Sequence, residues 1–167
     1  MDPTLRRYRI VLGLFILGLA LSGITAFPLL HELELLGRML GIPVDARPDA
    51  LTGLSHWIAT VRDGLREVHG RYPWMAYGTD WLAFAHLIIA LFFIEPWRNP
   101  GPNAWVLKTG LVACGSIFAL AFICGSIRGI PIYWQLIDCS FGVGGAIPLL
   151  YCLRLTRKME LASPKKP

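Results

Sequence analysis

The composition of this 167-residue chain is typical of a protein embedded in a lipid bilayer. Hydrophobic residues make up 54% of the chain and charged residues 16%, whereas an average soluble domain carries about 25% charged residues. The formal net charge of +5 does not call for nucleic acid as a partner. The basic residues gather beside apolar stretches, where they indicate membrane topology.

Four stretches are long and apolar enough to cross a hydrocarbon core of about 30 Å, which takes roughly 20 helical residues. They are residues 10–27, 74–94, 105–127 and 130–153. We expect the first to be a retained helix and not a cleaved signal peptide, because its apolar run is longer than a typical h-region. The sequence therefore predicts an all-α integral membrane protein, a bundle of four transmembrane helices in a single membrane domain over residues 1–167.

The segment between the first and second spans, residues 28–73, is the only sizeable stretch predicted to lie outside the membrane. Residues 29–40 mix apolar residues with charges, and residues 51–68 have apolar residues at helical spacing. The latter pattern predicts an amphipathic helix with one apolar face. Such a helix either lies on the bilayer surface or covers the end of the bundle. We expect a helical cap on the extracytoplasmic side.

The charges flanking the spans predict the orientation of the chain. Ten of the sixteen basic residues lie on the side of the termini: Arg6, Arg7, Arg9, Arg98, Lys108, Arg154, Arg157, Lys158, Lys165 and Lys166. The six arginines on the other side are offset by nearby acids. The positive-inside rule therefore predicts a multi-pass protein of a bacterial inner membrane, with both termini and the tail 154–167 in the cytoplasm. Membrane lipids are its expected partners.

Three ionisable residues lie inside predicted spans: Asp80 and His86 in the second, and Asp138 in the fourth. A charge at the centre of a membrane helix costs at least about 2.5–3.5 kcal/mol, so such residues usually face a bundle interior and have a function there. Asp80 either caps a helix start or faces the interior, and His86 either bonds a backbone carbonyl of a neighbouring helix or joins a site. Asp138 has no helix end nearby and needs a partner, for which Arg128, Asp80 and His86 are candidates.

Small and weakly polar residues mark one face of each predicted span, as in packed transmembrane helices. On the fourth span, Gln135, Asp138, Gly142 and Gly145 recur at helical spacing. The matching residues are Gly18, Ser22 and Thr25 on the first span, Thr79, Ala83, His86 and Ala90 on the second, and Gly110, Cys114, Ala121, Cys124 and Arg128 on the third. We expect these faces to point into the bundle.

These polar groups predict an intramembrane ligand site near the outer leaflet. A hydrophobic ligand is typically bound in an apolar cleft with a few convergent polar groups. We expect His86, Arg128, Gln135 and Asp138 to line such a cleft and to bind a lipid-type or quinone-type molecule or a membrane partner. The alternative is a non-enzymatic accessory or assembly subunit of a membrane complex, whose polar residues specify helix pairing.

A further alternative is catalytic and would use Asp80 and Asp138. Both lie at a similar depth, on the order of 23 Å from the cytoplasmic boundary, where two carboxylates sharing a proton would activate water against a lipid-anchored substrate. Residues 134–138, WQLID, resemble the aromatic–Asn–x–x–Asp motif of lipoprotein signal peptidases, which are four-helix proteins with both termini inside. The resemblance covers five residues, Gln135 replaces Asn, and the third span ends in GSIRG, without the aspartate of that family's second motif. It does not assign the family.

The sequence predicts no metal and no cofactor. None of the four cysteines forms a C-x-x-C pair, so neither a zinc cage nor a disulfide relay is expected. A haem would need axial ligands: His86 lies near the midplane and His31 at the outer interface, while His56 and His69 belong to the loop. This distribution excludes a di-haem arrangement and disfavours a single haem on His86.

Overall fold

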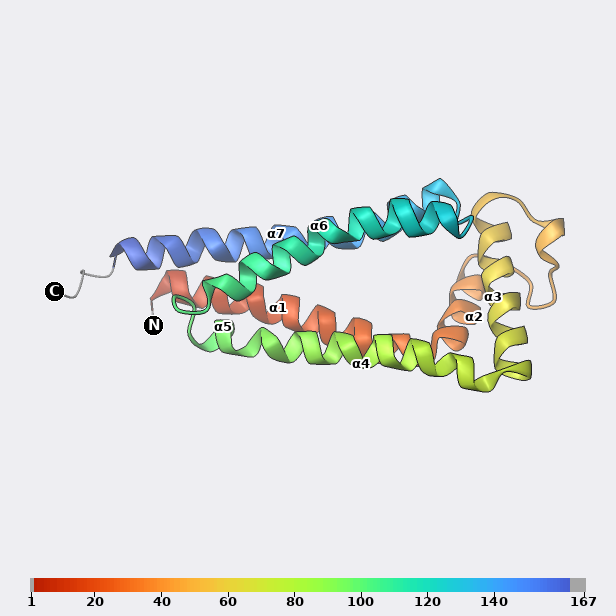
Figure 1. Cartoon of the computed structure of the whole chain (residues 1–167), viewed down its shortest axis with the longest axis horizontal. Helices are drawn as coiled ribbons and strands as arrows, with labels where there is room; N and C mark the ends of the chain where they lie inside the picture. The colour runs from red at the N-terminus through yellow and green to blue at the C-terminus, as the bar shows by residue number, and fades with distance from the viewer. Residues whose placement is uncertain (1, 163–167) are drawn as a thin grey trace. The chain divides into compact units, whose positions relative to one another are not determined.

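The computed structural model describes residues 2–162, which contain no strand and are mostly helical (Figure 1). Four candidate membrane-spanning helices are present: α1 (Pro3–Ala26), the stretch Pro73–Arg98, α6 (Ala104–Ile127) and α7 (Ile132–Ala162). The prediction of an all-helical chain with four candidate spans is therefore confirmed. The last of them is longer than predicted, because α7 continues through much of the expected tail; residues 163–167 of that tail lie outside the described residues.

The spans expose most of their apolar side chains. Only 11% to 22% of the residues in the most apolar part of each span are buried. Leu14, Leu120, Phe141 and Ile147 are each more than 60% exposed. A soluble monomer rarely leaves a continuous apolar surface of this extent in water, whereas hydrocarbon solvates it and a helix satisfies its own backbone groups there. The chain is accordingly compatible with a polytopic membrane protein.

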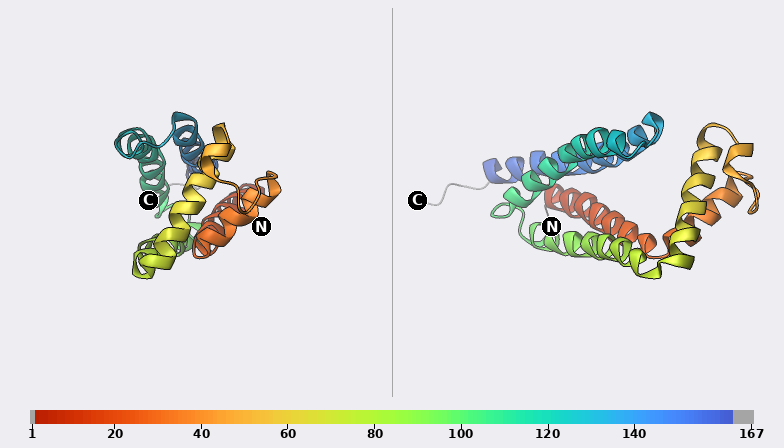
Figure 2. Two further views of the ribbon diagram at one scale, coloured as in Figure 1. Left: turned by 90° about the vertical axis from the view of Figure 1, so that its right-hand side faces the viewer. Right: turned by 45° about the vertical axis from the view of Figure 1, so that its right-hand side comes forward.

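The chain divides into two compact units, which are described separately. Unit 1 comprises Met1–Gly18 and Ile89–Pro167, and unit 2 comprises Leu19–Ile88. Unit 1 contains α5 (Ile94–Arg98) and the hairpin of α6 and α7, which run side by side (Figure 1 and Figure 2). The complete helices of unit 2 are α2 (Leu29–Met39), η1 (Pro48–Ala50), α3 (Gly53–Arg71) and η2 (Pro73–Ala76); it also holds most of α4 (Tyr77–Phe92).

A Schellman motif closes the turn between α6 and α7. Gly129 has a φ of +68°, a left-handed conformation that glycine adopts without the steric cost of a side chain. Its amide donates to the Ser126 carbonyl at 3.2 Å, and the Ile130 amide donates to the Gly125 carbonyl at 2.9 Å, which are the two bonds of this motif. The turn sends the chain back on itself, so the end of α6 and the start of α7 lie together.

Glycines set the contact between α6 and α7. A Cβ at Gly142 would lie 2.7 Å from the Cys114 carbonyl oxygen, and one at Gly145 would lie 2.9 Å from the Cys114 sulfur. Gln135 packs in the same way on Gly125, where an added Cβ would lie 2.9 Å from the Gln135 Cδ. On the predicted inner face of the fourth span, Gln135, Gly142 and Gly145 therefore all contact α6.

The predicted inner face of the first span is not the face that approaches α4. In unit 2, α1 approaches α4 at Gly23, where a Cβ would lie 2.8 Å from the Ala83 carbonyl oxygen and 3.0 Å from the His86 Cβ. The residues expected on this face are exposed: Gly18, Ser22 and Thr25. The Thr25 hydroxyl donates to the Ser22 carbonyl of its own helix at 3.3 Å, so it needs no partner helix. Closest backbone approach, and not polarity, decided which small residue faces α4.

Arginines of α3 hold the irregular segment between α2 and α3. Arg62 is 3% exposed, and its guanidinium donates to the Pro43 carbonyl at 3.1 Å, to the Ala46 carbonyl at 2.8 Å and to the Asp63 carboxylate at 2.9 Å. One buried guanidinium thus donates hydrogen bonds to two backbone carbonyls that lie outside regular secondary structure. Residues 29–40 and 51–68 were predicted to be helical, and the observed bounds of α2 and α3 differ from these by at most three residues. Their place as an extracytoplasmic cap stays a prediction.

Arg66 ties α2 to α3 directly. Its Nε and Nη2 atoms donate to the same Glu34 carboxylate oxygen, at 3.0 and 2.7 Å, and its Nη1 donates to the Val44 carbonyl at 3.2 Å. Both partners of the ion pair are about one third exposed. The hydrogen bond from Arg66 holds the pKa of the Glu34 carboxyl below its usual range.

Acid is expected to loosen α2 from α3. Because the folded-state pKa of Glu34 is lowered, its stabilisation is present above the unfolded-state pKa of about 4.3 and is lost as the pH falls through the folded-state pKa. Hydrogen-exchange protection factors of residues 29–39, measured from about pH 6 to about pH 3, should fall toward acid. A Glu34→Gln protein should lack this fall. The same acid response in both proteins would contradict the assignment to Glu34.

Candidate functional site

A groove lies between the end of α6 and the start of α7, within unit 1. Its volume is about 240 Å³, and it is lined by Ile117, Leu120, Ala121, Cys124, Gly125, Arg128, Ile130 and Asp138. All of these residues are apolar or small except Arg128 and Asp138. The groove therefore combines an apolar wall with one cation and one carboxylate, the composition of a site for a largely hydrophobic ligand.

The α6–α7 turn explains how the two charged residues reach the same groove. Arg128 is the C-cap of α6, and Asp138 lies nearly two turns into α7, after the chain has reversed. Arg128 is exposed and Asp138 is half-buried. Within residues 2–162, neither side chain makes a hydrogen bond or an ion pair. Arg128 and Asp138 both line the groove, but they do not form the ion pair for which Arg128 was a candidate.

Gln135 supports the groove from beside it. The side chain is 3% exposed, and its Nε2 donates to the Ile130 carbonyl at 2.7 Å. Its Oε1 is buried and has no hydrogen-bond donor among the described residues. Gln135 does not itself line the groove, but the two residues that it contacts, Gly125 and Ile130, both do. A buried acceptor without a donor costs about 1–3 kcal/mol, so this corner carries an unmet hydrogen bond.

His86 lies on α4, in unit 2, and its ring is already bonded. The Nδ1 atom lies 2.8 Å from the Leu82 carbonyl oxygen of the same helix, to which it donates. The bonded carbonyl lies one turn back along its own helix and not in a neighbouring helix, which was the partner weighed for His86. A role for His86 in ligand binding stays a prediction.

Asp80 lies in the first turn of α4 and is half-buried. Its carboxylate makes no hydrogen bond to any described residue, so the expected side-chain cap is not formed. A negative charge in a first turn still interacts favourably with the helix dipole. Asp80 belongs to unit 2 and Asp138 to unit 1, and the catalytic pair formed by these two residues stays a prediction.

The sequence could not mark the apolar wall of the groove. Ile117 and Leu120 are apolar residues within an apolar span, and nothing in their type or spacing distinguishes them from the other apolar residues of that span. Gly125 could have been found from the sequence. It lies four residues before Gly129, and a glycine at the end of an apolar run often marks the end of a helix. Of the four free cysteines, Cys124 is exposed and lines the groove.

Comparison of the chain with models of protein families, with curated proteins and with solved structures finds no match. Among residues 2–162, no group of three or more His, Cys, Asp or Glu side chains is placed to hold a metal ion.

Proposed function

We propose that this polytopic membrane protein binds a hydrophobic ligand of lipid or quinone type in the groove between α6 and α7. Arg128 and Asp138 engage the polar group of the ligand, and the apolar wall holds its first carbons. The observation that carries the proposal is that the groove combines these two charged side chains with an otherwise apolar lining. Neither charge has a partner among the described residues.

The size of the groove limits what enters it. A volume of about 240 Å³ is slightly below the range of about 300–1,000 Å³ usual for whole drug-sized ligands. A ring or a small polar head fits this space, and a long tail lies along the exposed apolar faces of α6 and α7. This favours a small membrane-soluble molecule over a transmembrane segment of a partner protein.

The charges of the groove select the chemistry of the head group. Arg128 only donates hydrogen bonds, and an ionised Asp138 only accepts them. The pair is neutral in sum, so an uncharged head group with both an acceptor and a donor satisfies both residues. A quinol, whose hydroxyls both donate and accept, is of this kind, and so is the free hydroxyl of a neutral glycerolipid; the carbonyls of a quinone only accept and would engage Arg128. The buried Gln135 Oε1 offers a further acceptor nearby.

The location of the groove in the cell follows from the charge distribution. By the positive-inside rule, both termini lie in the cytoplasm of a bacterial inner membrane, and α2 and α3 form the extracytoplasmic cap. The turn of Arg128 and Gly129 then lies toward the outer leaflet. A ligand reaches the groove laterally, from the bilayer.

Asp138→Ala is expected to abolish the retention of the ligand, whereas Asp80→Ala retains it. Loss of a hydrogen bond to a charged group costs about 1.5–3 kcal/mol, which is at least about a tenfold loss of affinity. Native mass spectrometry of protein released from a mild detergent measures the ligand as a discrete added mass. Ser140→Ala is the matched control on α7, because that hydroxyl bonds only its own helix, at the Ile137 carbonyl.

Two results would contradict the proposal. One is an added mass that survives Asp138→Ala unchanged in protein of equal helix content. The other is wild-type protein that carries no small ligand and instead copurifies with other subunits, which would favour the accessory-subunit alternative.

A further inference from the structure

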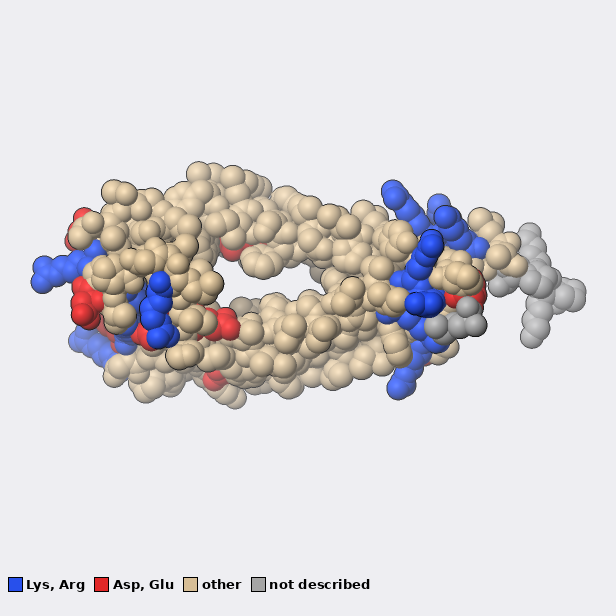
Figure 3. All heavy atoms as spheres, turned by 180° about the vertical axis from the view of Figure 1, so that it is seen from behind, with Lys and Arg blue, Asp and Glu red and all other residues tan. Residues whose placement is uncertain are grey.

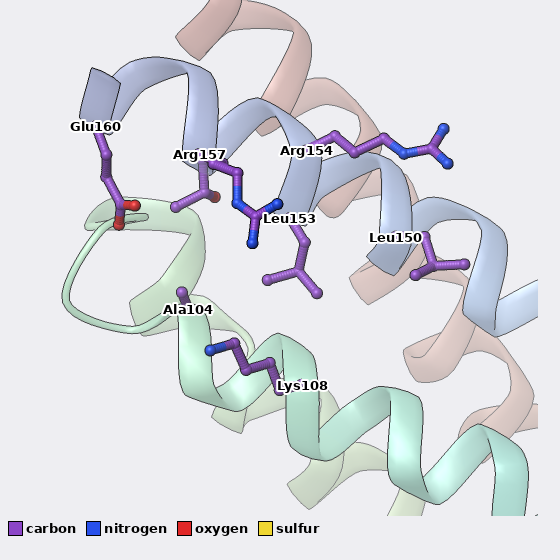
Figure 4. Close-up of a pocket in the computed structure, with 8 residues that line it drawn as sticks. Ala104, Lys108, Leu150, Leu153, Arg154, Arg157 and Glu160 are labelled. Carbon is purple, nitrogen blue, oxygen red and sulfur yellow. The ribbon is translucent and has the colours of Figure 1, made fainter. Parts of the chain in front are cut away.

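A second groove, different in chemistry, lies at the opposite end of the α6–α7 hairpin. It has a volume of about 340 Å³ and lies between the start of α6 and the last turns of α7 (Figure 4). Its lining residues are Ala104, Lys108, Leu150, Leu153, Arg154, Thr156, Arg157 and Glu160. Three cations and one carboxylate leave it a net charge of +2, beside an aliphatic wall.

The side chains of this groove converge from two helices. Lys108 on α6 and Arg157 on α7 point toward the space between the helices, and Leu153 lies between them (Figure 4). Arg154 also lines the groove, but its side chain extends away from Lys108 and Arg157 (Figure 4). The Thr156 hydroxyl donates to the Cys152 carbonyl at 3.0 Å, so it is already bonded within α7.

The three cations have no acidic partner in the described chain. Lys108, Arg154 and Arg157 form no ion pair with any of residues 2–162. The arginines of α3 are different. Arg62, Arg66 and Arg71 each have a carboxylate within 4 Å, on Asp63, Glu34 and Glu67 respectively. Each of these three arginines of α3 has an acid beside it, whereas no carboxylate of residues 2–162 lies within 4 Å of the three cations in the groove.

The groove lies where the apolar surface of unit 1 gives way to charge. Trp105, one turn before Lys108, is 62% exposed, and exposed tryptophans are typical of the membrane–water interface. Leu150 and Leu153 end the apolar part of α7, and Arg154 follows directly. Lys and Arg side chains gather over this end of unit 1 (Figure 3). The groove is thus level with lipid head groups.

We infer that this groove binds the phosphodiester of an anionic phospholipid. Lys108 and Arg157 clamp the phosphate from opposite helices, and a guanidinium presents paired donors that match phosphate oxygens. Arg154 adds a third positive charge nearby. Leu150 and Leu153 contact the glycerol and the first carbons of the acyl chains, and the Glu160 carboxylate accepts hydrogen bonds from head-group hydroxyls. The groove is separate from the one that holds Arg128 and Asp138.

The test compares lipid binding to full-length variants in detergent. Binding of phosphatidylglycerol and of phosphatidylcholine is titrated by native mass spectrometry against wild type and Lys108→Gln/Arg157→Gln. The control is Arg7→Gln/Lys158→Gln, which removes two cations outside the groove; Lys158 is the direct neighbour of Arg157. Loss of a direct hydrogen bond to a charged group weakens binding by roughly tenfold or more. The groove variant should therefore bind phosphatidylglycerol at least about tenfold more weakly, with the control close to wild type.

Three results would overturn the inference. If the groove variant and the control lost the same amount of affinity for phosphatidylglycerol, general charge attraction would explain the binding. Equal binding of phosphatidylcholine and phosphatidylglycerol by wild type would remove the selectivity for an anionic lipid. Displacement of bound lipid by millimolar inorganic phosphate would assign the groove to free phosphate. Circular dichroism confirms that the variants are folded, which is expected because all four substituted residues are on helices and none makes a hydrogen bond or ion pair with a described residue.

Discussion

Gly142→Val is expected to push α6 away from α7 and to destabilise the hairpin. An added Cβ at this position would lie 2.7 Å from the Cys114 carbonyl oxygen and 3.3 Å from a Phe118 ring carbon. The backbone oxygen cannot rotate away as a flexible side chain would, so one helix must shift. Overpacking of this kind costs about 1–3 kcal/mol, and occasionally more. Thermal unfolding in detergent, followed by circular dichroism, measures the loss.

Gly144→Val is the matched control for this prediction. It makes the same substitution two residues along α7, but no atom lies within 4 Å of an added Cβ there. Its midpoint of unfolding should stay close to that of wild type. If the two variants unfolded at the same temperature, the close contact of α6 and α7 at Gly142 would be refuted.

Arg62→Met is expected to release the segment between α2 and α3. The substitution keeps much of the aliphatic stem, but it removes the donors to the Pro43 and Ala46 carbonyls. Two acceptors then lose their charged donor beside a buried side chain, and each unmet group costs about 1–3 kcal/mol. Hydrogen exchange across residues 40–52 should become much faster, while exchange in α6 and α7 should not change.

Arg71→Met tests whether this effect is specific. Arg71 is 69% exposed, and its nearest carboxylate, on Glu67, is 3.7 Å away. Exposed pairs of this kind contribute about 0–1 kcal/mol, so exchange across residues 40–52 should stay near the wild-type rate. Equal acceleration by both substitutions would mean that Arg62 does not anchor the segment.

The inner faces show where the sequence was sufficient and where it was not. On α7, a regular series of small residues marked the side that contacts α6, and Gly142 and Gly145 lie on it. On α1, the same kind of series pointed to Ser22 and Thr25, yet Gly23 is the residue that approaches α4. Hydroxyl side chains bond their own helix and so tolerate exposure, which makes them an unreliable mark of an interface.

The candidate site was predicted only in part. Arg128, Gln135 and Asp138 lie within eleven residues of one another, and a single turn brings them to one corner; local spacing was therefore enough. No local pattern linked Asp80 and His86 to them, and a site including those two residues stays a prediction.

By itself, the sequence determined the helical fold and the four candidate spans. Those depend on the length and hydropathy of continuous segments, because hydrocarbon requires each span to satisfy its backbone within one helix. The tertiary structure alone decided which glycine touches a neighbouring helix and that Arg62 is buried against two loop carbonyls. It also decided that Lys108 and Arg157 converge without an ion-pair partner among residues 2–162. Each of these depends on the approach of segments distant in sequence, to within fractions of an ångström, and no single helix carries that information.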